Sequence, residues 1–148
     1  NPRLTALLRS RKGNAASGKT HFEKKCGVCH KLVGQGKTIG PPLDGYERGN
    51  LKFWLTAIVE PSLEIREGFQ SYLALTDDGR VVTGMMAQQD PNSITLRTAD
   101  DRQVVLVRDE LERFQPIQAS LMPEDVLKDL TEQQVVDLFE YLMLGTKR

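Results

Sequence analysis

The stretch that decides the fold is Cys26-Gly27-Val28-Cys29-His30, a C-x-x-C-H motif that contains both cysteines of the chain. The residues before the motif predict a helix that begins after Asn14, a favourable N-cap residue. Residues 31–49 are rich in glycine and proline and predict an extended loop. The motif therefore lies where a helix passes into a loop that is long enough to wrap a bound group.

The chemistry of the motif favours covalent attachment of haem. Two thiols at this spacing can each add to one of the two vinyl groups of haem, and the adjacent imidazole then meets the iron from the same side. We therefore predict one haem c, bound through Cys26 and Cys29, with His30 as an iron ligand. A zinc site would need four ligands, and His21 is the only other histidine or cysteine. A thioredoxin-like redox site would need a strand before the motif, where this sequence predicts a helix.

Two more helices are predicted on either side of a β segment. Asn50 is a suitable N-cap for a helix that stops before Pro61, and Thr131 begins a T-x-x-Q capping box for the last helix. Between them, residues 69–107 alternate apolar and polar residues around turn signals, which predicts about four antiparallel strands. The expected fold class is mainly α, with this small β meander as an insertion.

Length and composition predict a single domain. The chain has 148 residues, of which 39% are hydrophobic. Residues 1–13 are basic and weakly patterned, so we expect a leader or linker there and one domain over 14–148, with the β insertion at about 65–116. Since the chain begins with Asn1 and not with methionine, it is expected to be a mature product or a piece of a longer protein.

Charge and hydropathy exclude two classes of partner. Twenty Lys+Arg balance twenty Asp+Glu, so the formal net charge is +0, and no basic excess is present to recruit nucleic acid or anionic lipid. No apolar run approaches the length of a membrane span. The expected partners are therefore proteins.

The chain resembles the class I cytochromes c. The residues that carry the resemblance are Gly18, Phe22 and Cys26 before Cys29-His30, then Gly40-Pro41 and Leu43, and finally Met122-Pro123 before a terminal helix with Leu138 and Tyr141. The resemblance implies a cytochrome c fold of haem-wrapping helices, in which Phe22 of the first helix packs against Tyr141 of the last.

The segment between the second and last helices resembles the Pirellula/Verrucomicrobium-type haem-binding domain. The matching pattern comprises Ile65, Asp78-Gly79-Arg80, Val82-Thr83-Gly84, Ile94-Thr95-Leu96 and residues 120–124. In that family the haem domain commonly ends a long exported polypeptide, often beside a propeller or a dehydrogenase-like part. The resemblance therefore implies an exported, periplasmic or equivalent, location.

The second axial ligand must come from a small set of side chains, which are His21, Met85, Met86, Met122 and Met143. Met122 is the favoured ligand because it lies in a loop-like stretch before Pro123, and class I cytochromes take their methionine from an M-P step in this place. The other methionines fall on a predicted strand or helix, where packing is the usual role. His21 lies on the helix of the motif itself.

Three further residues are candidates to hold the haem or its ligand. The second ring nitrogen of His30 needs a hydrogen-bond acceptor, and the Pro41 carbonyl is the group that the Gly-Pro step of cytochromes c supplies. Arg48 and Trp54 are candidates to bind the haem propionates, through a charge-assisted hydrogen bond and an indole N–H respectively.

A haem with one histidine and one thioether ligand is coordinatively saturated, which favours electron transfer over oxygen chemistry. No catalytic base, nucleophile or substrate pocket is evident, so we do not expect an enzyme. We expect a monohaem domain that carries single electrons between an exported dehydrogenase-like partner, separate or fused, and another redox carrier. The alternative is a gas or redox sensor in which a small ligand displaces Met122. The edge strands of the meander are also candidates to dock a partner by strand addition.

Overall fold

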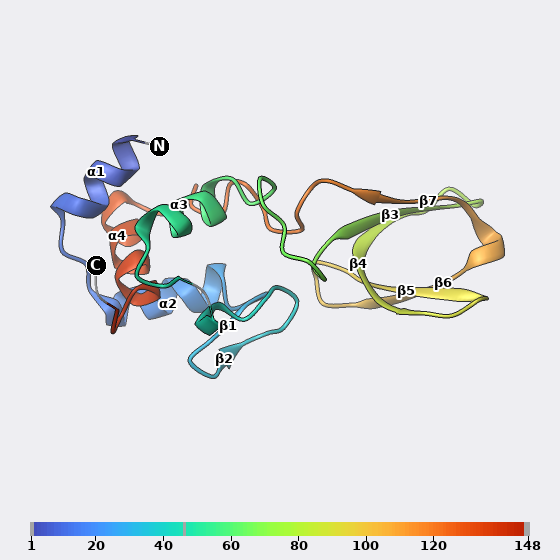
Figure 1. Ribbon diagram of the computed structural model, residues 1–148, viewed down its shortest axis with the longest axis horizontal. Helices are drawn as coiled ribbons and strands as arrows, with labels where there is room; N and C mark the ends of the chain where they lie inside the picture. Colours follow the sequence, from blue (N-terminus) through green and yellow to red (C-terminus); the bar gives the residue numbers. More distant parts are fainter. Residues whose placement is uncertain (1, 46, 147–148) are drawn as a thin grey trace. The chain divides into compact units, whose positions relative to one another are not determined.

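The computed structural model describes residues 2–45 and 47–146, and its described part divides into two compact units (Figure 1). The helical unit comprises Asn1–Leu63 and Glu124–Arg148, and the sheet unit comprises Glu64–Pro123. Asn1 of the predicted leader and residues 147–148 of the predicted domain lie outside the described residues, as does residue 46. Each unit is described below by itself.

The helical unit is built on α2 (Ala15–Lys25), α3 (Leu51–Val59) and α4 (Glu132–Leu142). All three begin at the predicted caps: the side chains of Asn14, Asn50 and Thr131 each accept a hydrogen bond from a backbone N–H of the first turn. Gln134 completes the capping box of α4. The three predicted helices are therefore confirmed. Within the part of the chain that the structure describes, no helix is both long and apolar enough to cross a membrane.

The contact between α2 and α4 is the centre of the helical unit. Phe22 is fully buried, and its ring centroid lies 5.4 Å from that of Tyr141. Gly18 lies where the two helices approach most closely, since a Cβ atom there would be 1.9 Å from the Asp137 carbonyl oxygen. The pairing of Phe22 with Tyr141 that the family resemblance implies is thus present.

The segment expected to be a leader or linker contains a helix, α1 (Pro2–Ser10). Leu8 of α1 is buried, and Arg3 and Arg11 both form ion pairs with Glu132 at the start of α4, at 2.7 and 3.4 Å. The signal for this helix was present in the i, i+3, i+4 spacing of Leu4, Leu7 and Leu8. This spacing covers too few residues to predict a helix in a segment that is otherwise basic.

The sheet unit overturns the expectation of a mainly α fold. Over the described residues, its strands form one five-stranded antiparallel sheet in the order β6-β5-β4-β3-β7 (Figure 1). The strands are β3 (Ser71–Thr76), β4 (Val81–Gln89), β5 (Ser93–Arg97), β6 (Gln103–Val107) and β7 (Leu111–Ile117), with a 3-10 turn, η2 (Arg108–Glu110), before the last. Because the chain contains this sheet as well as the helical unit, the fold is a mixture of helix and sheet.

The fifth strand, β7, is the one that the sequence did not predict. It returns to pair with β3, and the register shifts where Leu75 and Thr76 face Arg113 and Leu111. This irregularity breaks the alternation of apolar and polar residues from which a strand is recognised. β7 also contains Pro116, whose missing N–H is tolerated because the strand lies at the edge of the sheet.

The sheet unit has a hydrophobic core of its own. Ala74, Ile94, Leu96 and Leu106 are almost completely buried at its centre. The rings of Tyr72 and Phe114 stack beside them, with centroids 5.2 Å apart and planes at 10°. The sheet curls so that its strands enclose this core (Figure 1).

Candidate functional site

The C-x-x-C-H motif lies at the C-terminal end of α2 and continues it as a tight turn. Cys26 is the C-cap residue, and its carbonyl oxygen accepts hydrogen bonds from the backbone N–H groups of Cys29, at 3.0 Å, and His30, at 2.8 Å. Cys26 is buried and Cys29 is half-buried. One turn of backbone thus holds both thiols and the imidazole in a fixed order.

The His30 ring is held in one orientation by the loop that follows. Its Nδ1 lies 2.8 Å from the Pro41 carbonyl oxygen. Because a carbonyl oxygen can only accept, Nδ1 carries the proton in this bond, and the lone pair of Nε2 is left for a metal. Burial lowers the pKa of His30, which keeps the imidazole neutral, as a ligand must be.

Gly40 brings the loop against the face of the same ring. A Cβ atom at this position would lie 2.4 Å from Cε1 of His30 and 2.6 Å from its Nδ1. The Gly40 N–H donates to the Cys29 carbonyl oxygen at 2.6 Å, so a backbone hydrogen bond also ties the loop to the motif. Before Gly40 the loop forms a short hairpin of β1 (Lys31–Leu32) and β2 (Gln35–Gly36), which was not predicted. In the sequence Gly40 is distinguished only as part of the Gly-Pro step, and its contact with the ring is visible only in the structure.

Cys26 does not have the property of a redox-active thiol. Burial, and secondarily the nearby Cys29, raises the pKa of Cys26 to about 12. Redox-active C-x-x-C cysteines have lowered pKa values, because the thiolate is the nucleophile. Among residues 2–45 and 47–146, no three His, Cys, Asp or Glu side chains gather to hold a metal ion unaided, as a zinc site requires. Two thiols beside an oriented neutral imidazole are the donor set that fits haem c.

Arg48 and Trp54 use their hydrogen-bonding groups within the chain. The Arg48 guanidinium donates from Nε to the Leu142 carbonyl oxygen, at 3.1 Å, and from Nη2 to that of Leu144, at 3.2 Å. The buried Trp54 indole donates from Nε1 to the Arg48 carbonyl oxygen at 2.9 Å. Arg48 therefore ties the segment before α3 to the C-terminal end of α4, where a cation is favourable. The predicted bonds to haem propionates stay a prediction.

Replacing Arg48 by alanine is expected to lower the free energy of unfolding by about 2 kcal/mol, because two charge-assisted hydrogen bonds to helix-end carbonyls are lost. Urea denaturation followed by circular dichroism measures the change. Arg9→Ala, at an exposed position of α1, is the control and should stay within about 0.5 kcal/mol of the wild type. Equal effects of the two substitutions would show that Arg48 does not clamp α4.

Met122 lies in an irregular segment after β7, at the end of the sheet unit. It is half-buried, and its backbone N–H donates to Ser120 Oγ at 3.1 Å. Met85 is buried in β4, and Met86 packs against the core of the sheet. Met143 is buried as the C-cap residue of α4, and His21 is half-buried on α2. The assignment of Met122 as iron ligand stays a prediction.

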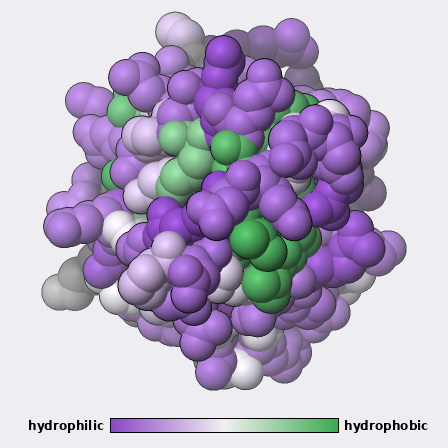
Figure 2. Space-filling view, turned by 90° about the vertical axis from the view of Figure 1, so that its right-hand side faces the viewer, coloured by the Kyte–Doolittle hydropathy of each residue, from purple (hydrophilic) through white to green (hydrophobic). Residues whose placement is uncertain are grey.

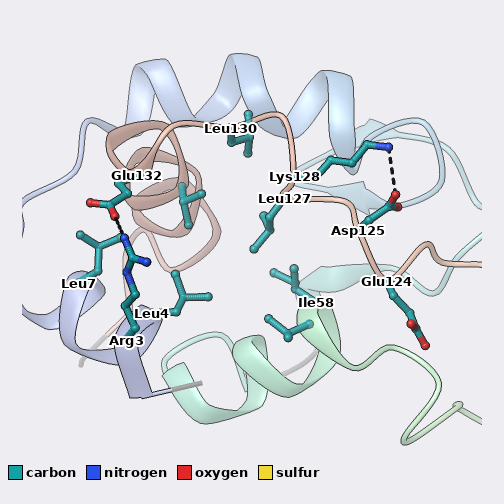
Figure 3. A pocket seen from close by; sticks show the side chains of 12 residues that line it. Arg3, Leu4, Leu7, Ile58, Glu124, Asp125, Leu127, Lys128, Leu130 and Glu132 are labelled. Atoms are coloured by element: carbon teal, nitrogen blue, oxygen red, sulfur yellow. Dashed lines mark hydrogen bonds and ion pairs between the residues drawn. The ribbon is translucent and has the colours of Figure 1, made fainter.

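The helical unit also contains an apolar groove of about 400 Å³ between α1, α3 and the residues before α4 (Figure 3). Its apolar lining includes Leu4, Leu7, Ile58, Leu127 and Leu130. Two ion pairs lie at the groove, Arg3 with Glu132 at 2.7 Å and Lys128 with Asp125 at 3.1 Å (Figure 3). Cys26, Cys29 and His30 do not line it, so the groove is separate from the motif.

Comparison with known proteins gives a family for the region that contains the motif. The sequence profile of the cytochrome c family matches residues 15–106, which is more than half of the chain. The matched region includes the C-x-x-C-H motif and the loop that holds His30. A search of curated proteins finds no significant match. On the strength of the profile match and of the donor set at the end of α2, the chain belongs to the cytochrome c family, whose members are haem-binding electron carriers.

Proposed function

We propose that the chain is a monohaem electron carrier in which His30 and Met122 would both bind the iron. The observation that carries the proposal is the geometry of His30, whose Nδ1 is held by the Pro41 carbonyl oxygen beside two thiols of the same turn. A single C-x-x-C-H motif in the chain supports one haem. When bound, the haem supplies the iron centre that gains and loses one electron.

The chain's own residues would attach, orient and shield this group. Cys26 and Cys29 would form its thioether bonds, and Nε2 of His30 would bind the iron. The Pro41 carbonyl would hold the His30 ring in one tautomer and would raise the basicity of the ligand. The thioether of Met122 would fill the sixth position and so leave no open site for oxygen, which suits an electron carrier rather than an enzyme.

We further propose an exported location and a protein redox partner. Covalent attachment to C-x-x-C-H supports export, because cytochrome c domains are usually exported. The resemblance of residues 65–124 to the Pirellula/Verrucomicrobium-type domain supports a dehydrogenase-like donor, separate or fused, and a second redox carrier as acceptor. The balanced formal charge gives no support to nucleic acid as a partner.

The test of this function is the visible absorption spectrum of the purified holoprotein, oxidised and reduced. We expect a c-type reduced spectrum together with the weak far-red ferric band of methionine ligation. Met122→Ala is expected to lose the far-red band, whereas Met86→Ala, a methionine of the sheet core, keeps it. A wild-type spectrum that is already high-spin or bis-histidine would refute the assignment of Met122.

Binding of CO to the reduced protein separates electron carrier from sensor. A carrier with a firmly bound methionine is expected to bind CO slowly or not at all. Rapid binding to the wild type would favour the gas or redox sensor, in which the small ligand displaces Met122.

A further inference from the structure

Strand β6 (Gln103–Val107) forms one edge of the sheet, and half of its backbone groups face away from the sheet. The hydrogen bonds from Arg108 N–H to the Asn92 carbonyl and from Thr98 N–H to the Arg102 carbonyl fix its register against β5. In an antiparallel ladder, bonded pairs alternate, so Val104 and Leu106 bond to β5. The N–H and C=O groups of Gln103 and Val105, and the N–H of Val107, therefore point outward from the edge, whereas the Val107 carbonyl accepts within the 3-10 turn η2.

The two edges of the sheet differ in how they are protected. The opposite edge, β7, carries Pro116, the charged pair Glu112 and Arg113, and an irregular register, all of which hinder the addition of another strand. In contrast, β6 has the sequence QVVLV, without charge or proline. An uncharged edge strand with free backbone groups is a template for pairing.

The solvent-exposed face of β6 also carries apolar side chains. Val105 and Val107 are 65% and 45% exposed, and their side chains lie on the face opposite the core residues Val104 and Leu106. Figure 2 shows the end of the molecule drawn at the right in Figure 1, where small hydrophobic areas interrupt a mostly hydrophilic surface. Covering the exposed valines at this unprotected edge would remove apolar surface from water, which is favourable.

We propose that two copies of the chain pair through β6, antiparallel, about a two-fold axis at Val105. In this register Val105 faces Val105 of the second copy, and Gln103 faces Val107. The Val105 pair then makes two hydrogen bonds, and on either side of it the Val107 N–H donates to the Gln103 carbonyl oxygen of the other copy. The two five-stranded sheets become one continuous sheet, and the interface is isologous, as in most dimers.

A second copy of the chain suits this edge because the strand carries no charge that would repel an identical strand. The five residues of β6 carry none, so an identical strand meets no repulsion. Arg102 and Arg108 flank the strand and would face each other across the axis, but each is held in its own chain. Arg102 pairs with Asp100 at 3.0 Å, and Arg108 donates to the Asp90 carbonyl oxygen at 2.8 Å. Pairing also places the exposed valines side by side, a favourable cross-strand contact.

The first test is sedimentation velocity of the holoprotein over a range of concentrations. We expect a reversible dimer, and we expect Val105→Lys to weaken dimerisation by about tenfold or more, because it places like charges at the axis. Val81→Lys is the matched control: Val81 is 63% exposed but lies on β4, inside the sheet, and should leave the dimer unchanged. An unchanged haem spectrum and circular dichroism show that each variant is folded.

The second test locates the contact. The Cα atoms of a bonded antiparallel pair lie about 5.5 Å apart, within the range of a disulfide. The Val105→Cys holoprotein, with dissolved oxygen as oxidant, is therefore expected to form a covalent dimer, and Val81→Cys is not. A wild type that stays monomeric would overturn the proposal. A monomer is also the result expected if β6 pairs with another part of its own chain. A dimer that survives Val105→Lys, or that gives no Val105→Cys cross-link, would overturn it too.

Discussion

Replacing Gly18 by alanine is expected to lower the free energy of unfolding by about 3 kcal/mol, at the upper end of the cost of overpacking. The new Cβ atom would lie 1.9 Å from the Asp137 carbonyl oxygen and 2.9 Å from Cβ of Tyr141. The first of these atoms is backbone of α4 and cannot turn aside as a side chain would. The helices must therefore separate, and Phe22 and Tyr141 lose their contact. Denaturant unfolding of the holoprotein, followed by circular dichroism, measures the loss.

Gly45→Ala is the control for this substitution. Gly45 lies in the 3-10 turn η1 (Leu43–Gly45), and a Cβ atom there meets no atom within 4 Å. It changes the same residue type by the same methyl group, so it should leave stability within about 0.5 kcal/mol of the wild type. If Gly18→Ala lowered the free energy of unfolding no more than Gly45→Ala does, α2 and α4 could not be in close contact at Gly18.

Replacing Gly40 by alanine is expected to act on the haem rather than chiefly on stability. Its Cβ atom would overlap the His30 ring, at 2.4 Å from Cε1, so the ring has to turn or shift. Either motion breaks the 2.8 Å hydrogen bond to Pro41, which sets the tautomer. We expect the yield of correctly ligated holoprotein to fall by about tenfold, the lower end of the cost of losing such a partner. The remainder should show a high-spin ferric spectrum.

Absorption spectra of Gly40→Ala and Gly45→Ala, purified side by side, measure this effect. Gly45→Ala should match the wild type in yield and in spectrum, because its methyl group touches nothing. A normal low-spin spectrum for Gly40→Ala would show that His30 has room beside the loop, and that Gly40 does not position it.

Much of the helical unit could be predicted because its signals are local. The caps at Asn14, Asn50 and Thr131 and the C-x-x-C-H motif are each contained within a few residues. The fold class was wrong because the strands were expected to be a small insertion in a helical fold, whereas they form a five-stranded sheet with its own core. The last strand, β7, was missed because its partner lies far away in the chain. β7 pairs with β3 through an irregular register, and no local alternation of apolar and polar residues predicts this strand.

The candidate site shows the same limit. Sequence and family pattern together indicated the Pro41 carbonyl, since a Gly-Pro step is a local feature. The acceptors of Arg48 lie at the far end of the chain, on Leu142 and Leu144, and no pattern near Arg48 points to them. Only the packing of α4 brings these carbonyls within reach of the guanidinium.

The acceptor for the His30 ring is a main-chain oxygen, and this has a consequence for mutational scanning. Every amino acid at position 41 carries the same carbonyl, so a scan of side chains passes over this contact without removing it. Pro41→Ala should therefore be tolerated as long as the loop keeps its path. Substitutions can disturb this contact only by changing the path of the backbone. The positions where they do so are neighbours such as Gly40, which hold the loop against the His30 ring.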